Sequence, residues 1–498
     1  MCCCRRSKNL SSFGNKFIAV VAFQYVQFAS DRRSGRVPVS VPSTQANGGL
    51  RRELGLFPAL TSNMLNMVGV GPFVTIPLIL AAMGGPQALL GWILGAIIAA
   101  CDGMVWAELG AAMPGSGGSY DYLQQAFGPR SLGRLMGFLF LWQVMISAPL
   151  TAASGSVGFA DYARYLLPSL TFAQQKLIAI GVCLFSTILL YRDIRSIGKI
   201  SAVLWAGLIA TMGVIIWGGA THFQSAVAFD FPPGAFRLSP AFFVGLGGAT
   251  LLSMYDYSGY FNVCLIGGEI KRPGVNIPRV VLLSIGILAC LYLAMSFSII
   301  GVLPWQQAVH STAIVSDFME RIYGPAAASV MTCMILWVAF ASVFCVLLGY
   351  TRVPYAAAAE GHFFSAFARV HPKRHFPSFS VVFMGVLSAA ACLLPLEALI
   401  KALIIMQIVT QFAAQCIAVI LIRRVRKDIV RPFSMPLYPI PVLVALAGWI
   451  FILVSSGRVY VISGIAVVVF GVLAYLWRAR QISVWRWEKE PAGLRTGR

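Results

Sequence analysis

The chain alternates between long apolar segments and short polar connections. Twelve apolar segments lie between residues 57 and 477, and most reach the length of roughly 18 residues that crosses about 30 Å of hydrocarbon. They cover residues 57–82, 87–107, 135–158, 176–191, 200–219, 241–266, 280–303, 325–350, 379–394, 398–422, 438–455 and 459–477. This pattern predicts an all-α polytopic membrane protein with twelve transmembrane helices.

Composition and the placement of charge support this prediction. The chain is 58% hydrophobic and only 11% charged, whereas soluble domains carry about 25% charged residues. Although the net charge is +21, 32 of the 38 Lys and Arg residues fall in alternate connections and the two tails. Basic residues mark cytoplasmic segments. We therefore expect both termini inside the plasma (inner) membrane, a lipid bilayer as the surroundings and no nucleic-acid partner.

Three regions follow from the apolar pattern. Residues 1–56 are interpreted as a basic cytoplasmic tail, with an over-extended gene start as the alternative. The apolar run at residues 17–29 is too short to cross a bilayer. Residues 57–478 form the predicted transmembrane domain, and residues 479–498 form a second cytoplasmic tail.

The first apolar segment contains residues that disfavour a helix. Gly69, Gly71, Pro72 and Pro77 lie in its middle, where Pro removes a backbone donor and Gly weakens the helix. Broken backbone within a bilayer is tolerated only when protein buries it or when it lines a watery cavity. The segment is either a simple Pro kink or an unwound stretch that presents free amides and carbonyls to a substrate.

A second interruption favours the unwound stretch. The sixth segment carries Gly259 just past its middle, within the sequence YDYSGY. Paired interruptions in corresponding halves indicate a transporter site. Five spans per repeat would invert the second half, so we expect repeats at residues 57–219 and 241–422, with two extra helices at residues 438–477.

Four motifs resemble the amino acid–polyamine–organocation transporter superfamily over roughly residues 57–430. VGVGPF looks like the family's broken first helix, and WAELGAAMPGSGGSYDYL (106–123) looks like its second-helix exit. YSGYFNVCLIGGEIKRPGVNIPR (257–279) is similar to the sixth-helix signature, and TRVPYAAAAEGHFFSAFARVHPK (351–373) is similar to the eighth-helix exit. A single GxG is weak, but four motifs in order are specific.

The resemblance implies a LeuT-like fold with substrate held between the breaks of helices one and six, flanked by helices three and eight. On this reading the first break supplies amide donors from Gly69, Val70 and Gly71. The opposite wall is formed by Tyr255, Asp256, Tyr257, Ser258 and Gly259. Tyr255 matches an aromatic residue that gates the site in some members.

Two positions in these breaks depart from expectation. Pro72 replaces an amide-bearing residue where many members hold an α-carboxylate, and Pro has no N–H. The end of the half-helix still offers a positive dipole, so we expect a weakened carboxylate site. Asp256 is a mid-membrane carboxylate, which is costly unless paired, protonated or solvated. We favour a substrate-amine or proton partner, with a structural hydrogen-bonding role or a misplaced helix boundary as the alternatives.

Asp102 is the other acid expected within the membrane. Plant-type polyamine uptake transporters carry an acid at the matching position and a Gly-Pro-Phe like Gly71–Phe73, which favours amine substrates. Against this, the acid that those transporters carry shortly afterwards is Ile76 here. Asp102 is expected near the cytoplasmic end of its span, where snorkelling lowers its cost. It is therefore either an amine or proton partner or a structural residue, and interfacial Glu108 is expected to be structural.

The titratable residues limit which groups could couple transport to a proton. The five histidines fall in predicted loops, so a coupling proton would bind Asp256 or Asp102 (His222, His310, His362, His371 and His375). Lys199 is interpreted as a topology charge, and hydroxyls such as that of Ser342 leave sodium coupling open. No Cys pair has metal-ligand spacing, so neither a metal nor a cofactor is expected.

The sequence therefore predicts a secondary-active permease of amino acids or polyamines and related amines, with a cationic preference, coupled to protons or acting as an exchanger. An enzyme is disfavoured because HExxH, GxSxG and GxxxxGK[ST] motifs are missing. A transporter-fold sensor that binds without moving its ligand, or a channel, is the alternative. The sequence fixes neither the substrate nor the oligomeric state.

Overall fold

The structure is a computed structural model, and it describes the transmembrane part of the chain. The described residues are 52, 54–115, 117–128, 132–190, 197–359, 361, 363–371 and 377–481. Most of the predicted tails at residues 1–56 and 479–498 lie outside this set, as do His362 and His375. The side chain of Lys199 is also outside it, although its backbone belongs to a helix.

All regular secondary structure among the described residues is helical, apart from one isolated parallel bridge between Leu54 and Ile270. In chain order the elements are α2 (Leu56–Met67), α3 (Gly71–Met83), η1 (Pro86–Ala88), α4 (Leu89–Ala112), α5 (Ser119–Phe127), α6 (Leu132–Leu166), α7 (Phe172–Leu189), α8 (Ile197–Thr221), α9 (Ser225–Ala228), α10 (Pro240–Tyr257), α11 (Asn262–Leu265), η3 (Gly267–Glu269), α12 (Pro273–Ile300), α13 (Trp305–Ala308), α14 (Ile314–Tyr323), α15 (Pro325–Tyr350), α16 (Arg352–Ala359), η4 (Ser365–Ala368), α17 (Ser378–Ala391), α18 (Leu396–Gln407), the π-helical η5 (Ile408–Phe412), α19 (Ala413–Val425), α20 (Ile440–Ser455) and α21 (Arg458–Gln481).

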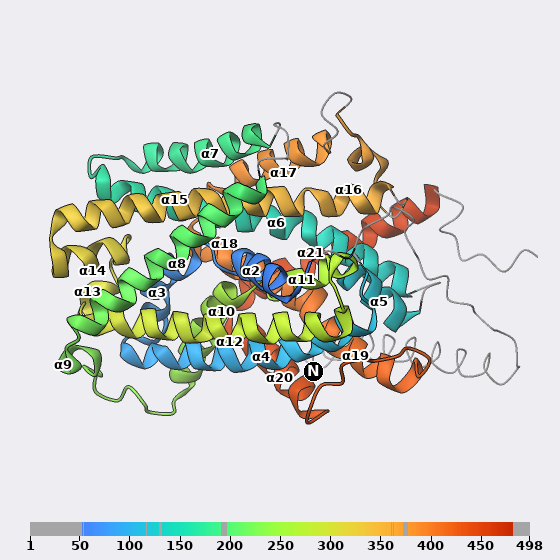
Figure 1. The fold of residues 1–498 in the computed structure, drawn as a ribbon, viewed down its shortest axis with the longest axis horizontal. Helices are drawn as coiled ribbons and strands as arrows, with labels where there is room; N and C mark the ends of the chain where they lie inside the picture. Colours follow the sequence, from blue (N-terminus) through green and yellow to red (C-terminus); the bar gives the residue numbers. More distant parts are fainter. Residues whose placement is uncertain are drawn as a thin grey trace, which may run out of the picture. The chain divides into compact units, whose positions relative to one another are not determined.

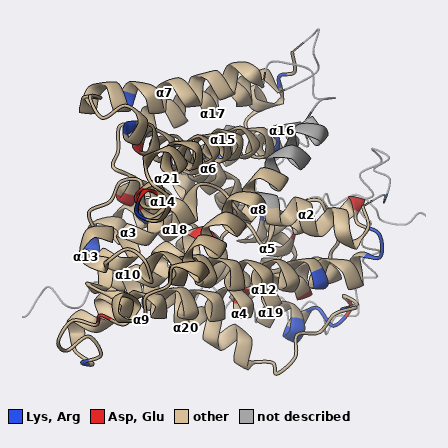
Figure 2. Ribbon diagram, turned by 60° about the vertical axis from the view of Figure 1, so that its left-hand side comes forward, with Lys and Arg blue, Asp and Glu red and all other residues tan. Residues whose placement is uncertain are grey.

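Seven of the described helices are long and apolar enough to cross a bilayer, and four shorter ones are also apolar. Most of the charged residues lie towards the two ends of these helices, with long uncharged stretches between them (Figure 2). Many large apolar side chains on the outer helices are exposed, such as Val454 and Phe470. An aqueous protein would bury such a surface, so the prediction of an all-α polytopic membrane protein is confirmed.

Each predicted apolar segment coincides with a helix or an interrupted helix, but several limits differ. Helix α6 extends to Leu166, well past the expected end at residue 158, and α12 begins at Pro273 rather than at residue 280. Both extensions are less apolar than the segment they continue, so an apolar window misses them. Pro273 is the first residue of α12, where its missing N–H leaves no internal hydrogen bond unmade.

The centre of the bundle contains the interrupted helices. Helix α10 packs against α3 and α4, and α4 packs along α12. Figure 1 shows α2 and α11 next to one another in the middle of the described helices, with α4 and α12 side by side. Most of the buried apolar side chains belong to one continuous cluster that includes residues of α2, α3 and α10. The two interruptions are therefore held in the protein interior rather than facing lipid.

Pro77 lies inside α3 and leaves one backbone carbonyl without its helical donor. That carbonyl belongs to Phe73, and the Tyr162 hydroxyl of α6 donates to it at 2.7 Å. The same hydroxyl accepts the backbone N–H of Val315, in the first turn of α14, at 3.4 Å. The interior proline is thus compensated by a neighbouring helix, which ties α3 to α6 and α14.

Candidate functional site

The first interruption lies between α2 and α3. Helix α2 ends at Met67 and α3 begins at Gly71, so residues 68–70 are not helical. Among the described residues, no acceptor bonds the backbone N–H groups of Gly69, Val70 and Gly71. Pro72 sits in the first turn of α3, where a missing N–H costs nothing. The break therefore presents three successive free donors at the positive end of a helix.

The second interruption follows α10. Helix α10 ends at Tyr257, and Gly259 adopts a φ of +107°, which favours glycine. A Cβ at Gly259 would lie 2.9 Å from the carbonyl oxygen of Asn66 in α2. The second break can approach the first this closely only because residue 259 has no side chain.

Asn63 of α2 clamps the second break. Its Oδ1 accepts the N–H of Val263 at 3.0 Å, and its Nδ2 donates to the carbonyl of Tyr260 at 3.1 Å. The same Nδ2 lies 3.1 Å from the Ser284 hydroxyl of α12. Buried backbone groups released by a broken helix need such partners. The side-chain amide of Asn63 thus supplies hydrogen-bond partners to the irregular backbone after α10. Among the described residues, the backbone N–H groups of Gly69–Gly71 receive no such partner.

Helices α3 and α10 lie antiparallel, and their ends meet at the breaks. Gly71, the first residue of α3, faces Asp256 in the last turn of α10: a Cβ at Gly71 would collide with the Asp256 carboxylate. At the far end, a Cβ at Gly245 in α10 would lie 2.5 Å from the carbonyl of Ala82 in α3. The positive end of one half-helix and the negative end of another therefore face the same point.

Asp256 is buried, and its carboxylate is only half partnered. Thr75 of α3 donates its hydroxyl to Oδ2 at 2.6 Å. Oδ1 has no hydrogen-bond partner among the described residues, and the side chain is 1% exposed. A buried carboxylate oxygen without a donor is costly, which is typical of a group that awaits a ligand, a proton or water. Thr75 was not identified from the sequence.

Tyr255 and its partner complete one wall. The Tyr255 hydroxyl lies 2.8 Å from the Ser154 hydroxyl of α6, and its ring edge is 3.0 Å from where a Cβ on Gly71 would be. Ser342 of α15 also lies next to the first break, because a Cβ on Gly69 would be 2.5 Å from its hydroxyl. Helices α6 and α15, which are the third and eighth predicted spans, therefore flank the first break.

Two other residues predicted for this wall, Ser258 and Tyr257, differ in their relation to the breaks. Ser258 follows α10 directly, and its N–H bonds the carbonyl of Tyr255 at 3.2 Å. The Tyr257 ring instead packs between Trp92 of α4 and Tyr292 of α12, with ring centres 5.8 and 5.6 Å away. Residues two apart on a helix point to nearly opposite sides. Of the predicted set, Tyr257 is therefore the residue whose side chain lies away from the first break.

Asp102 of α4 lies apart from this group and is fully partnered. Its Oδ2 accepts the Tyr260 hydroxyl at 2.5 Å, and its Oδ1 accepts the indole N–H of Trp449 in α20 at 3.1 Å. The side chain is completely buried. The expectation that Asp102 snorkels to the cytoplasmic interface is wrong, because neighbouring helices cover it and supply the donors that water would have given.

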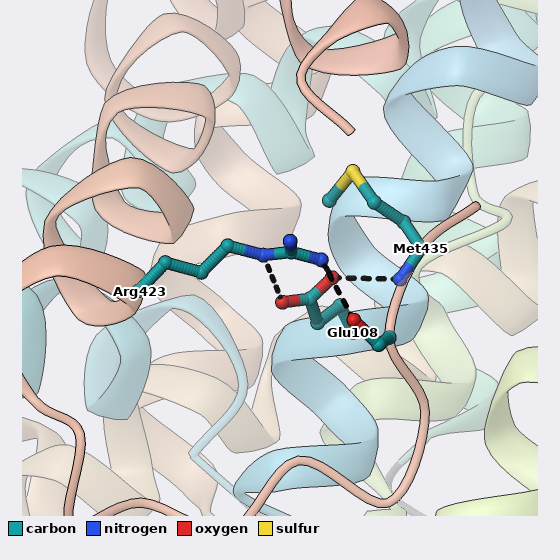
Figure 3. A network of polar contacts seen from close by, with 4 residues as sticks. Glu108, Arg423 and Met435 are labelled. Carbon is teal, nitrogen blue, oxygen red and sulfur yellow. Dashed lines mark hydrogen bonds and ion pairs between the residues drawn. The ribbon is translucent and has the colours of Figure 1, made fainter. Parts of the chain in front are cut away.

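Glu108 forms a buried ion pair one and a half turns further along α4. Its two oxygens accept Nε and a terminal nitrogen of Arg423 in α19 at 2.7 and 2.5 Å, and Oε2 also accepts the N–H of Met435 at 2.9 Å (Figure 3). The Arg423 guanidinium also lies 3.9 Å from the centre of the Tyr438 ring. This network joins α4 to α19 and to the connection before α20, away from the breaks.

Comparisons with known proteins agree with this arrangement. A family model described as "Amino acid permease" matches residues 54–479. The serine/threonine exchanger SteT of Bacillus subtilis (strain 168) is 26% identical over 422 residues, which cover 82% of this chain and 92% of that protein. The branched-chain amino acid permease BcaP of the same organism is 24% identical over 469 residues, covering 89% and 96%. The large neutral amino acids transporter small subunit 2 of Rattus norvegicus is 28% identical over 442 residues, covering 86% and 80%.

Proposed function

The chain belongs to the amino acid permease family, and on that premise we propose that it is a secondary-active transporter of neutral L-amino acids, which it holds between the two helix breaks. One observation carries the proposal: three free amides at the start of α3 lie beside the unpartnered Oδ1 of Asp256 at the end of α10. The amides at Gly69–Gly71 would bind the α-carboxylate, and Asp256 would bind the α-ammonium.

The start of α3 and the end of α10 match the two charged groups of an α-amino acid, its carboxylate and its ammonium. Free N–H groups and the positive end of a helix favour a carboxylate. An unpaired carboxylate at the negative end of α10 favours an ammonium. The Tyr255 ring, held by Ser154, would cover the substrate from one side. Because each group is supplied by a different half-helix, a bound amino acid would connect α3 with α10.

The number of free carboxylates favours neutral substrates over polyamines. Asp256 is the one carboxylate at the breaks in the part of the chain that the structure describes, and the α-ammonium would use it. Asp102 already accepts hydrogen bonds on both oxygens. The relatives SteT, BcaP and the rat transporter are named for serine and threonine, branched-chain and large neutral amino acids. A diamine would need a second acid, so the cationic preference expected from sequence has less support than a neutral substrate.

We propose the LeuT-like arrangement as the framework, with repeats at residues 57–219 and 241–422, extra helices at residues 438–477 and alternating access. Two interrupted helices that lie antiparallel and meet at their breaks support it. The distribution of Lys and Arg supports cytoplasmic termini in a plasma membrane. Binding would shift the outward–inward equilibrium through contacts that differ between the two states.

Coupling to protons or to exchange is part of the same proposal. When no ammonium is bound, a proton on Asp256 would remove the cost of an unpaired buried charge. Uptake into proteoliposomes with an inward proton gradient, with sodium replaced by choline, or with amino acid preloaded inside would distinguish proton coupling, sodium coupling and exchange. We expect uptake to persist without sodium, and uptake that depends strictly on sodium would contradict the proposal.

A thermal-shift panel tests the substrate class. Purified protein is melted with serine, leucine and alanine, with lysine and arginine, and with putrescine and spermidine. We expect neutral L-amino acids to raise the melting temperature, because a ligand that binds only the folded state stabilises it. A shift with putrescine or spermidine and none with neutral amino acids would overturn the neutral assignment.

Flux measurements then separate a transporter from its two alternatives. Proteoliposomes should show saturable uptake and counterflow of the amino acids that shift the melting temperature. Binding without flux would identify a sensor, and unsaturable flux without counterflow would identify a channel. Either result would contradict the permease.

A further inference from the structure

A cavity of about 330 Å³ lies far from the helix breaks, where α3 ends and α10 begins. Its walls come from the end of α3, from η1, from the loop that precedes α10 and from the first two turns of α10. This loop projects from the end of the described helices (Figure 1). The cavity therefore joins the outer ends of the same two half-helices whose inner ends form the proposed substrate site.

The lining of the cavity includes a cationic side chain, that of Arg237, and a free backbone donor at Ala241. Arg237 is exposed and has no ion-pair or side-chain hydrogen-bond partner among the described residues. The N–H of Ala241, in the first turn of α10, also has no acceptor among the described residues, because the Ser239 hydroxyl bonds the N–H of Phe242 instead. Arg and a helix N-terminus are both favourable for a phosphate.

The cavity wall also includes a buried acceptor that has no donor among the described residues. Gln87 is 4% exposed, and its Nε2 donates to the carbonyl of Met83 at 2.7 Å. This bond fixes the orientation of the amide and leaves Oε1 unpartnered beside Pro232 in the cavity wall. A buried carbonyl oxygen without a donor is costly. The cavity thus needs a ligand that has an anionic part and, at its other end, N–H or O–H donors.

Large apolar residues that neighbour the cavity lining along the chain are exposed. The loop and the first turns of α10 expose large apolar residues, of which Leu238 is 74% exposed (Phe231, Phe236, Leu238 and Phe243). Aromatic residues at the end of membrane helices mark the lipid–water interface. The ligand would therefore lie where lipid headgroups lie, with hydrocarbon beside it.

We infer that this cavity binds the phosphoethanolamine headgroup of a membrane phospholipid. The phosphate lies against Arg237 and the N–H of Ala241, and the primary ammonium donates to Oε1 of Gln87. A choline headgroup has the same phosphate but no N–H, so it cannot satisfy Gln87. The bound headgroup would hold the end of α3 against the start of α10. This inference does not depend on which substrate the breaks bind.

Short-chain lipids added to the purified full-length protein test the inference. Dihexanoyl phosphatidylethanolamine, phosphatidylcholine and phosphatidylglycerol are titrated below their micelle concentrations, and binding is followed by intrinsic Trp fluorescence or microscale thermophoresis. We expect the ethanolamine lipid to bind at least about tenfold more tightly than the choline lipid, because it alone makes a charge-assisted hydrogen bond to Gln87. Equal binding of the ethanolamine and choline lipids, or of the ethanolamine and glycerol lipids, would overturn the inference.

Two substitutions assign the contacts. Arg237→Gln should weaken both the ethanolamine and the choline lipid by about tenfold, since both contain the phosphate. Gln87→Met should remove the preference for ethanolamine while leaving choline binding unchanged. Arg458→Gln is the matched control, because Arg458 is also exposed at the start of a helix but does not line the cavity. An Arg237→Gln variant that binds like wild type would overturn the phosphate assignment.

Free phosphoethanolamine distinguishes a lipid from a soluble ligand. If the apolar rim contributes, the headgroup alone should bind at least about tenfold more weakly than the dihexanoyl lipid. Equal affinities would show that the site takes a soluble phosphoamine instead and would overturn the lipid assignment. Size-exclusion profiles and melting temperatures establish that each variant is folded, and the exposed Arg237→Gln keeps the test decisive if Gln87→Met does not fold.

Discussion

Two aspartates are buried among the described residues, Asp256 in α10 and Asp102 in α4, and their surroundings differ. Asp102 accepts hydrogen bonds on both oxygens, from Tyr260 and Trp449. Asp256 accepts one, from Thr75, and its other oxygen faces a helix break whose amides are also free. Burial is nearly the same for the two, at 0% and 1% exposed. Burial alone therefore does not separate a structural acid from a functional one.

A missing hydrogen-bond partner distinguishes a functional acid from a structural one. A satisfied buried polar network stabilises one arrangement of helices, whereas an unsatisfied one lowers stability until something binds. The Glu108 network is a second satisfied example, since Arg423 and the N–H of Met435 together occupy both of its oxygens. The comparison thus predicts that substitutions at Asp256 change transport, while substitutions at Asp102 and Glu108 change stability.

The largest effect is expected for Asp256→Asn. The substitution keeps the shape and the bond from Thr75 but removes the negative charge that would pair with the α-ammonium. Loss of one partner of a buried charge pair costs about 2–5 kcal/mol, so kcat/KM for uptake should fall by at least about 30-fold. Uptake into proteoliposomes measures it, and an unchanged melting temperature establishes folding. Uptake at wild-type rates would remove Asp256 from the site.

Gly71→Ala should come next. Its added methyl group would overlap the Asp256 carboxylate at the place where the substrate is proposed to bind. Overpacking costs about 1–3 kcal/mol, which corresponds to roughly a 5- to 150-fold loss of kcat/KM. Gly213→Ala in α8 is the matched control, because no atom of the described residues lies within 4 Å of its added Cβ. If both variants transport like wild type, the close approach of α3 to α10 has no role in function.

Arg423→Met should reduce stability more than transport. It leaves Glu108 buried, 1% exposed and without its cation, which costs about 3–5 kcal/mol. The melting temperature should fall strongly, while the KM of the remaining folded protein stays close to wild type. Lys401→Met is the control, because its ion pair with Glu397 is more exposed and should contribute less than about 1 kcal/mol. A changed KM with an unchanged melting temperature would contradict a purely structural network.

Sequence predicted the helices and both interruptions because these depend on local properties. Apolar length marks each span, and Gly69 and Gly259 mark the breaks directly. The same local reasoning could not find Thr75, Ser154 or Asn63, whose partners lie 181, 101 and 200 residues away along the chain. Small polar residues are common in membrane helices, and nothing in the sequence states which of them meets a carboxylate.

Two further properties could not be predicted from the sequence: the direction in which a side chain points and its burial by neighbouring helices. The family resemblance assigns Tyr257 to the same wall as Asp256, yet the regular helix continues through Tyr257 and turns its ring towards Trp92 and Tyr292. Asp102 was placed by its distance from the end of its own span, and that measure ignores the neighbouring helices. The indole of Trp449 comes from a helix 347 residues later. Depth in a span therefore predicts the cost of a charge only where the side chain faces lipid or water.

Asp102→Asn is expected to have the smallest effect and gives the sharpest test of the comparison. The remaining oxygen can keep the bond from Trp449, and the new amide can donate to the Tyr260 hydroxyl, so only the charge is lost. The cost should be about 1 kcal/mol, with a slightly lower melting temperature and uptake within about threefold of wild type. Asp102→Leu, which leaves both donors buried and unpaired, should destabilise the protein more strongly. If Asp102→Asn instead stops uptake at an unchanged melting temperature, full partnering does not identify a structural acid, and Asp102 joins Asp256 as a proton or amine partner.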